Sequence, residues 1–248
     1  MIRARRVDWF NTWFSGHARS RIRNTFGEVR VRGLDAAQKV AAEGPVLVVS
    51  NHTSWWDPLV ALHVSTHMLG MAGHAMMDAK NLRRLPFFAL VGGFGVELGN
   101  SKDGAAVIRY AAELLDAPKN LVWVFPQGAE RPIHERPLGF RRGAGEIARI
   151  APKAKVLPIG LHYEFGGMER PTLWVSFGDV VISEQDAEKN RAAQEQAVTV
   201  EMDRIERVMG HSGREFATYW KSPAPIVGLA MERMLAMMTG WWVSTRGG

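Results

Sequence analysis

A histidine and an aspartate stand five residues apart in the stretch VLVVSNHTSWWDP, which runs from Val46 to Pro58. Residues at this spacing point in different directions on a helix and to opposite faces of a strand, so only a turn can bring His52 and Asp57 together. The carboxylate would then accept the imidazole N–H, fix the tautomer and leave the other ring nitrogen to take up a proton. Joined by a turn, the two residues could therefore form an imidazole that takes up a proton.

The same stretch has a simpler interpretation. Asp57 stands directly before Pro58, and an aspartate is a good N-cap while a proline suits the first turn of a helix. In that case His52 is an ordinary loop histidine and Asp57 only begins the helix PLVALHVSTHML. This stretch alone leaves both interpretations open.

A second loop carries groups that could bind a substrate. The segment FPQGAERP follows the apolar run NLVWV and places Gly128 where the backbone needs conformational freedom, with Arg131 just beyond. Farther on, FRRGAGE adds Arg141 and Arg142. Such cations can hold a phosphate, and exposed main-chain N–H groups can meet a developing oxyanion. The alternative is a solvated basic loop.

The elements that must position these loops alternate along the chain. The runs VLVVS, NLVWVFP, AKVLPIGLHYEF and TLWVSFGDVVI read as strands, and helical patterns separate several of them. This alternation predicts an α/β fold with a mostly parallel or mixed central sheet flanked by helices, preceded by an N-terminal amphipathic helical segment. Ligands of such sheets bind beyond the carboxyl ends of the strands, where both loops fall.

The composition narrows the chemistry. The 248 residues, of which 46% are hydrophobic, suffice for one α/β domain with appended helices. The chain has no cysteine, which excludes disulfides, thiolate zinc sites and a cysteine nucleophile. His63 and His67 have a spacing that can bind a metal, but no carboxylate motif accompanies them. We therefore interpret both as histidines on a helix surface or in the core.

The positive charge indicates an anionic partner. The formal net charge is +6, and the first residues combine arginines with Trp9, Phe10, Trp13 and Phe14, which share one face of a helix. Such a helix suits the headgroup region of a membrane with anionic lipids. It could equally dock on its own domain. Nucleic-acid motifs are absent, so we predict no nucleic-acid partner.

The sequence predicts contact with a membrane without crossing it. No uninterrupted apolar stretch reaches the ~20 residues that a spanning helix needs, and the N-terminus lacks the apolar core of a signal peptide. We divide the chain into an N-terminal basic and aromatic helical segment (1–32), an α/β domain (33–210) and a C-terminal helical extension (211–248). The methionine-rich part of that extension reads as a core helix or as a second membrane anchor.

The motifs together resemble the glycerolipid acyltransferases, the family of 1-acylglycerol-3-phosphate acyltransferases. NHTSWWDP resembles the family's His-x4-Asp signature, FPQGAER resembles its Phe-Pro-Glu-Gly-Thr-Arg block, and VLPIGL resembles a later strand with a central proline. The similar region spans roughly Gly33 to Asp179, and the order and spacing of the blocks agree with the family.

The resemblance implies a function. His52 would be the general base that takes the proton of an acceptor hydroxyl, Asp57 would orient it, and Gly128 would help to form the acceptor or oxyanion site. The acyl donor would be acyl-CoA or acyl carrier protein, and the acceptor a lysolipid, first of all 1-acylglycerol-3-phosphate, giving phosphatidic acid. The resemblance also implies no metal, no cofactor and no acyl-enzyme. The enzyme would act peripherally on the cytoplasmic face of the cell membrane, with anionic lipids as partners. A non-catalytic basic lipid-binding module is the alternative from another class.

Several positions depart from the family pattern. Gln127 stands where a glutamate is usual, Glu130 stands where the arginine is expected, and Asn100 stands where an arginine normally grips the acceptor phosphate. These changes leave open a different lyso- or glycosylated lipid acceptor. We predict as substrate-binding residues Asn100, Gln127, Gly128, Arg131, Arg141 and Arg142, and we expect Arg131 to be the main phosphate ligand.

Overall fold

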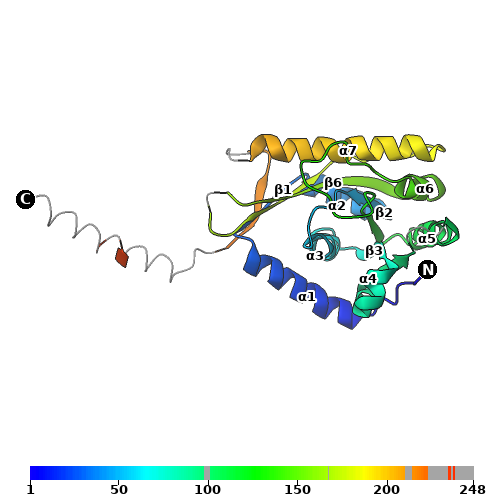
Figure 1. The fold of residues 1–248 in the computed structure, drawn as a ribbon, viewed down its shortest axis with the longest axis horizontal. Helices are drawn as coiled ribbons and strands as arrows, with labels where there is room; N and C mark the ends of the chain where they lie inside the picture. Colours follow the sequence, from blue (N-terminus) through cyan, green and yellow to red (C-terminus); the bar gives the residue numbers. More distant parts are fainter. Residues whose placement is uncertain (98–100, 167, 210–213, 223–233, 236, 238–248) are drawn as a thin grey trace, which may run out of the picture.

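The computed structural model describes the chain except for residues 98–100, 167, 210–213, 223–233, 236 and 238–248. Within the described residues, eight strands form one sheet in the order β4-β3-β5-β2-β6-β7-β1-β8 (Figure 1). The strands are β1 (Glu28–Arg32), β2 (Val46–Ser50), β3 (Ala72–Asp78), β4 (Gly93–Val96), β5 (Asn120–Val124), β6 (Lys155–Glu164), β7 (Thr172–Phe177) and β8 (Ala217–Lys221).

The sheet is mixed. The pairs β3–β4, β3–β5, β2–β5, β2–β6 and β1–β7 are parallel, whereas β6–β7 and β1–β8 are antiparallel. The predicted α/β fold with a mostly parallel or mixed sheet is confirmed. Strand β2 lies between β5 and β6, and all five of its residues are buried. A strand covered on both faces reads as a continuous apolar run, which explains its sequence.

Helices cover both faces of the sheet. They are α1 (Asp8–Thr25), α2 (Leu34–Glu43), α3 (Asp57–His63), the π-helix η1 (Val64–Met68), α4 (Ala79–Arg84), the 3₁₀-helix η2 (Pro86–Val91), α5 (Ser101–Leu114), α6 (Gly143–Ile150) and α7 (Ala187–Val208). One core cluster joins α1, α2 and α3 to the sheet, and a second joins α5, α6 and α7. Figure 1 shows α1 and α7 on opposite sides of the sheet.

Alternation along β2 supplies both clusters. Val46 and Val48 belong to the cluster under α3, whereas Leu47 and Val49 belong to the cluster under α5 and α6. Successive strand residues point to opposite faces, so an unbroken apolar strand fills both. This double burial fixes the end of β2, and with it the start of the loop that carries His52.

The N-terminal helix α1 packs on the domain with one face and exposes its other face to solvent. Its Ser15, Ala18 and Ile22 are buried against the domain, whereas Trp9 and Trp13 are 73% and 61% exposed. Residues 28–32, which we had grouped with the N-terminal segment, form strand β1 of the sheet. No helix among the described residues is long and apolar enough to cross a membrane.

Other elements differ in detail from their predictions. The helix expected after Pro58 divides into α3 and η1, where the N–H of Leu69 donates to the carbonyl of Val64. Strand β8 lies within the C-terminal segment for which we expected helix, and pairs with β1. Most of the methionine-rich stretch lies outside the described residues.

Candidate active site

The turn between β2 and α3 is held by its own side chains. The amide of Asn51 donates to the carbonyl of Leu161 and accepts from its N–H, both at 2.8 Å. At the end of β2, the indole N–H of Trp123 donates to the hydroxyl of Ser50 at 2.9 Å. Because all three side chains are buried, the loop leaves the sheet at a fixed place and angle.

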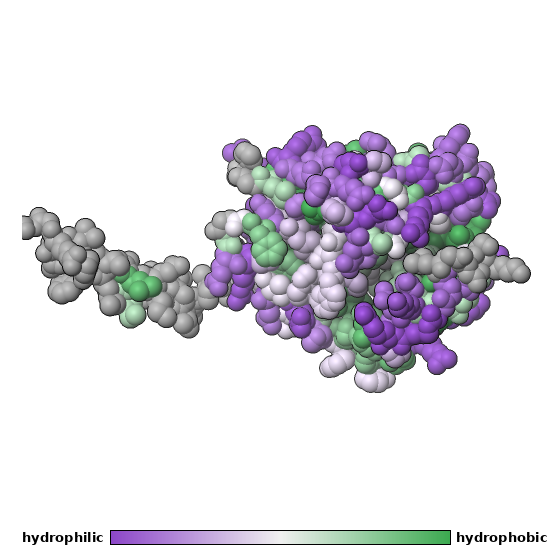
Figure 2. Space-filling view, viewed as in Figure 1, coloured by the Kyte–Doolittle hydropathy of each residue, from purple (hydrophilic) through white to green (hydrophobic). Residues whose placement is uncertain are grey.

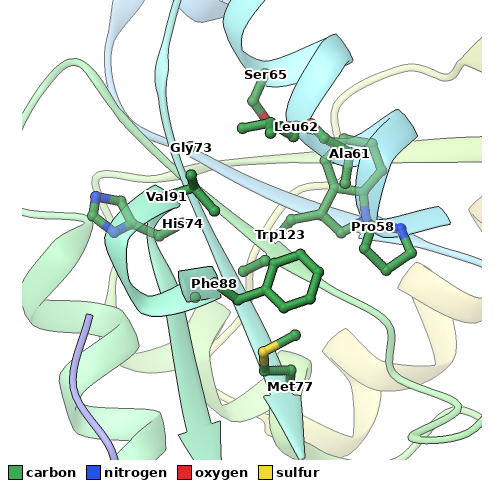
Figure 3. Close-up of a pocket in the computed structure, with 12 residues that line it drawn as sticks. Pro58, Ala61, Leu62, Ser65, Gly73, His74, Met77, Phe88, Val91 and Trp123 are labelled. Carbon is green, nitrogen blue, oxygen red and sulfur yellow. Dashed lines mark hydrogen bonds between the residues drawn. The ribbon is translucent and has the colours of Figure 1, made fainter. Parts of the chain in front are cut away.

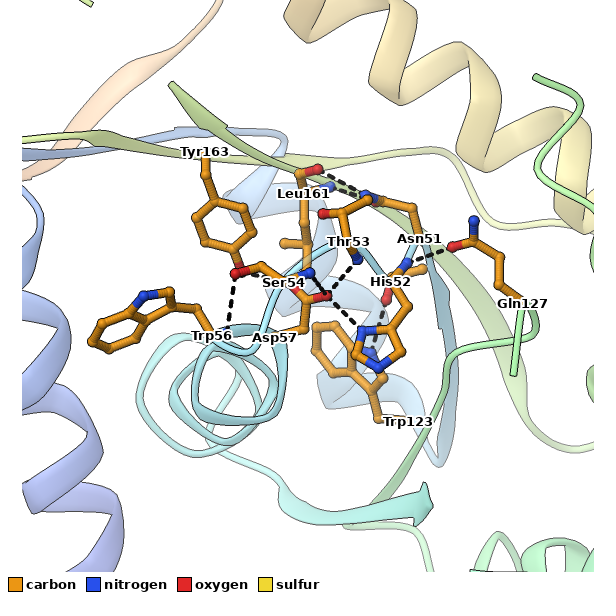
Figure 4. Close-up of polar contacts among 11 residues, drawn as sticks. Asn51, His52, Thr53, Ser54, Trp56, Asp57, Trp123, Gln127, Leu161 and Tyr163 are labelled. Atoms are coloured by element: carbon orange, nitrogen blue, oxygen red, sulfur yellow. Dashed lines mark hydrogen bonds and ion pairs between the residues drawn. The ribbon is translucent and has the colours of Figure 1, made fainter. Parts of the chain in front are cut away.

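The turn brings His52 and Asp57 into contact, as Figure 4 shows. The distance between His52 Nδ1 and Asp57 Oδ2 is 2.7 Å. The same oxygen accepts the backbone N–H groups of Thr53 and Ser54 at 2.7 and 2.9 Å. A carboxylate that accepts from Nδ1 places the imidazole proton there, so Nε2 carries the lone pair. The side chain of His52 is 18% exposed and that of Asp57 is fully buried.

The simpler interpretation of Asp57 as an N-cap is wrong. The N-cap of α3 is Trp56, and its side chain makes no capping hydrogen bond. The carboxylate of Asp57 points back to residues 52–54 rather than forward to the first N–H groups of the helix. Its position as first residue of α3 therefore serves the histidine.

Asp57 accepts a further hydrogen bond from a tyrosine that belongs to none of the recognised motifs. The hydroxyl of Tyr163, from β6, donates to Asp57 Oδ1 at 2.5 Å (Figure 4). Burial raises the pKa of Tyr163 well above its usual value, and the charge and hydrogen bond of Asp57 raise it further. The hydroxyl is therefore a permanent donor. Tyr163 is the second residue after the VLPIGL block, separated from it by His162. This closeness to a family block was the only sequence feature that pointed to it.

The loop after β5 encloses His52 from the other side. The ring of Phe125 stacks on the imidazole with centroids 4.5 Å apart. The buried side chain of Gln127 accepts the backbone N–H of His52 at 2.5 Å, and the N–H of Arg131 donates to the carbonyl of His52 at 2.9 Å. Gln127, which we expected to bind substrate, thus holds the backbone of the histidine.

The predicted cations differ in their surroundings. Gly128 has φ of +73°, and a Cβ atom there would lie 2.8 Å from the guanidinium carbon of Arg141. Arg131 is paired with Glu135 at 2.6 Å, and Arg142 with Glu146 at 3.1 Å. For the exposed guanidinium of Arg141, the structure shows no ion pair with any described residue. Asn100 lies outside the described residues.

An apolar pocket opens beside the first turn of α3 (Figure 3). Its volume is about 40 Å³, and α3, η1, η2, β3, β4 and β5 contribute to its wall. The lining residues are Pro58, Ala61, Leu62, Ser65, Gly73, His74, Ala75, Met77, Phe88, Val91, Gly93 and Trp123. Pro58, which directly follows Asp57 in the chain, is one of them, so the first turn of α3 forms part of the pocket wall.

His63 and His67 lie where α1 packs on α3 and the π-helix that follows it. Their rings are 5.2 Å apart, and His67 Nε2 lies 3.2 Å from the carbonyl oxygen of Ser15 in α1. Among the residues that the structure describes, no group of three or more His, Cys, Asp or Glu side chains could hold a metal ion. These histidines therefore belong to the packing of α1 on α3.

Comparisons with known proteins agree with this geometry. The acyltransferase family model matches residues 28–162, more than half of the chain. A search of the curated proteins gives no match. Among solved structures, the chain is similar to the 1-acyl-sn-glycerophosphate (LPA) acyltransferase PlsC from Thermotoga maritima, with 16% sequence identity and a TM-score of 0.58 over 79% of each chain.

The structural similarity shows the fold, and the family model shows the family. The matched region contains the strand β2, the turn with His52 and Asp57, the loop with Gln127 and Gly128, and most of β6. The resemblance drawn from the sequence motifs is therefore confirmed. The chain belongs to the acyltransferase family.

Proposed function

We propose that the protein transfers a fatty acyl group from acyl-CoA or acyl carrier protein to the hydroxyl of a lysolipid, and that 1-acylglycerol-3-phosphate is the acceptor and phosphatidic acid the product. The observation that carries the proposal is the contact between His52 and Asp57, which leaves Nε2 with a lone pair, and the next residue, Pro58, lines an apolar pocket. A base together with an apolar pocket suits a reaction between a hydroxyl and a long-chain acyl group.

The proposed reaction is direct transfer. His52 Nε2 takes the proton of the acceptor hydroxyl while its oxygen attacks the thioester carbonyl. The tetrahedral intermediate expels the thiolate, which receives the proton from the imidazolium. Asp57 stabilises the imidazolium with a charge that is fully buried and already held by two backbone N–H groups. No covalent acyl-enzyme is required.

The apolar pocket supports a fatty acyl group. It is lined by alanine, leucine, methionine, phenylalanine and tryptophan side chains and by two glycines, Gly73 and Gly93. Burying a methylene group contributes about 0.8 kcal/mol, so such a wall favours part of an acyl chain over a polar group. Pro58 and Ala61 place the pocket on the same turn of α3 as Asp57.

The guanidinium of Arg141 supports a phosphate-bearing acceptor. Its backbone N–H donates to the carbonyl of Pro126 at 2.9 Å, which ties it to the loop around His52. Gly128 leaves the space that the guanidinium occupies. Arg131, our expectation from the sequence, already pairs with Glu135. A guanidinium without a carboxylate partner in the described chain is the better phosphate ligand.

The exposed face of α1 supports work at a membrane surface. Trp9 and Trp13 project into solvent, and Trp55, within the turn between β2 and α3, is 63% exposed. Figure 2 shows mainly hydrophilic residues over α7 and apolar residues between α1 and α4. Tryptophan rings and arginines together favour anionic lipid interfaces. We propose that the enzyme sits peripherally on the cytoplasmic face of the cell membrane.

A thioester-release assay tests the proposed activity. Purified protein is given acyl-CoA with and without lysophosphatidic acid, and the released thiol and the phosphatidic acid are both measured. The variant His52→Ala should lose ~10²–10⁴-fold in turnover, since this is the usual contribution of a general base. Asp57→Asn should lose somewhat less, because it loosens the imidazole without removing it.

The control is His134→Ala, which removes an exposed histidine from the 125–142 loop. It should keep wild-type turnover, and far-ultraviolet circular dichroism should show that all three variants are folded. Near wild-type turnover in a folded His52→Ala protein would refute the mechanism. Lipid binding without any thiol release would favour the non-catalytic basic module.

A further inference from the structure

Tyr163 reaches Asp57 from a part of the chain far from the histidine. Strand β6 pairs with β2, and its residue Tyr163 lies beyond the end of β2, over the turn. The two oxygens of Asp57 divide their partners. Oδ2 meets His52, Thr53 and Ser54, whereas Oδ1 meets the tyrosine hydroxyl (Figure 4).

We propose that Tyr163 is a positioning residue of the acyl-transfer reaction, which selects the oxygen of Asp57 that faces His52 and limits the negative charge that the imidazole experiences. The proposal rests on the proposed function, in which His52 is the base. A hydrogen bond to a charged group is stronger than one between neutral groups, so its loss changes how strongly Asp57 stabilises the neighbouring imidazolium.

The tyrosine ring is held independently of its hydroxyl. Its centroid lies 5.8 Å from that of Phe26, and Phe26 makes an edge contact with Trp56 at 5.3 Å. Phe26 is 1% exposed. These apolar contacts do not involve the hydroxyl, so a phenylalanine at position 163 keeps the packing and removes one hydrogen bond.

The hydroxyl donates at every pH at which the enzyme can be assayed. Burial, with the charge of Asp57, raises the pKa of Tyr163 well above its usual value. Around the pair, the 125–131 loop presents the neutral Gln127 and an Arg131 that is paired with Glu135, and α1 places Arg21 over Trp56 at 5.7 Å. In the described part of the chain, Tyr163 and His52 are the titratable side chains bonded to Asp57.

Removing the hydroxyl has a defined electrostatic sign. Thr53 and Ser54 still hold Oδ2 against His52. The carboxylate, with one donor fewer, stabilises the imidazolium more strongly and makes the base harder to deprotonate. The acidic limb of the kcat/KM profile should therefore move to higher pH.

The test is the pH profile of Tyr163→Phe, measured by thiol release from pH 5 to 9. We expect the midpoint of the acidic limb to rise by about one pH unit, which corresponds to ~1.4 kcal/mol, with about tenfold lower kcat/KM below the midpoint. The matched control is Tyr110→Phe, which changes a buried tyrosine on α5. An unchanged profile in a folded Tyr163→Phe protein would show that the tyrosine only fills space.

A second measurement covers the case in which Tyr163→Phe does not fold. The chain has three tyrosines, so all can be replaced by 3-fluorotyrosine, whose more acidic phenol is a stronger donor. The acidic limb should then move to lower pH. A shift to higher pH, or none, would overturn the proposal.

Nuclear magnetic resonance separates this proposal from the proposed function. The titration of the His52 ring, assigned with His52→Gln, is followed in wild-type and Tyr163→Phe proteins without substrate. A shift in ring titration with an inactive enzyme would uphold the role of Tyr163 toward Asp57 and reject the acyl-transfer proposal. Identical titration curves would reject the role of Tyr163 alone.

Discussion

The arginines of the 125–142 loop differ in whether a carboxylate already pairs with their guanidinium group. Arg131 and Arg142 each pair with a glutamate on the same segment, whereas the guanidinium of Arg141 lies over Gly128. Arg141→Ala should therefore raise the KM for lysophosphatidic acid about tenfold, because a charge-assisted hydrogen bond contributes about 1.5–3 kcal/mol. The KM for acyl-CoA should change little.

Steady-state kinetics with each substrate varied in turn measure this effect. The matched control is Arg142→Ala, which removes a neighbouring guanidinium that is already paired. A larger effect of Arg131→Ala would restore our original expectation for the phosphate ligand. If the wild type and all variants prefer a neutral lysolipid or a glycosylated lipid alcohol to lysophosphatidic acid, Arg141 does not bind a phosphate.

The sequence predicted the local contacts of the site and missed the distant ones. His52 and Asp57 lie within one turn, so their spacing contained the information. Tyr163 meets Asp57 across more than a hundred residues, and its place depends on the pairing of β6 with β2. The same pairing problem hid the role of Gln127, whose partner is a backbone N–H that carries no sequence signature.

At the scale of elements, helix α1 has one packed face and one exposed face. One face packs on α3 and η2, where Phe14 contacts Phe87 and Phe88, and the other exposes Trp9 and Trp13. The aromatic pattern was readable from the sequence. Which aromatics would be covered was not, because the residues that cover them lie on η2. For the same reason, the sequence did not predict the short strands β3 and β4, which are defined by their pairing with each other and with β5.

The double variant Trp9→Ser/Trp13→Ser should bind anionic vesicles more weakly than the wild type. Both side chains are exposed, so their removal takes interfacial area away without opening the core. Co-sedimentation with vesicles containing phosphatidylglycerol measures binding, which should also weaken as salt rises. This variant is preferable to a truncation before Gly27, since that would uncover the residues on which Ile22 packs.

The control is Ile182→Ser, which alters a residue that is even more exposed but lies on the segment leading to α7. It should leave vesicle binding unchanged. Undiminished binding of the double tryptophan variant would place the membrane contact elsewhere, and Trp55 would be the next residue to change.

At the scale of the whole molecule, buried histidines link stability to pH. Burial first, then the neighbouring His67, Arg19 and Arg23, lower the pKa of His63 from 6.5 to about 4. Burial and Arg6 lower the pKa of His74 from 6.5 to about 4. Between these values the unfolded chain binds more protons than the folded one. The contribution of the two histidines to the free energy of unfolding is therefore complete above pH 6.5 and is lost as the pH drops toward 4.

The free energy of unfolding in urea should therefore decrease from pH 7 to 4.5. Each histidine contributes roughly 3 kcal/mol at most, from the difference between its two pKa values. The variant His63→Gln should show a shallower decrease, because a glutamine does not take up a proton. The matched control is His17→Gln, on α1. Equal slopes in wild type and His63→Gln would contradict this account.

The position of β1 also sets the order in which the molecule can be completed during synthesis. Its residue Val29 pairs with Leu173 of β7 and with Trp220 of β8. Strand β1 is therefore synthesised long before its two partner strands and stays unpaired until they have been made. The site strand β2 likewise waits for β5 and β6. Pairings this far apart in sequence make folding slow and leave strand edges open meanwhile. We therefore expect the nascent chain to need protection from aggregation until translation has passed Lys221.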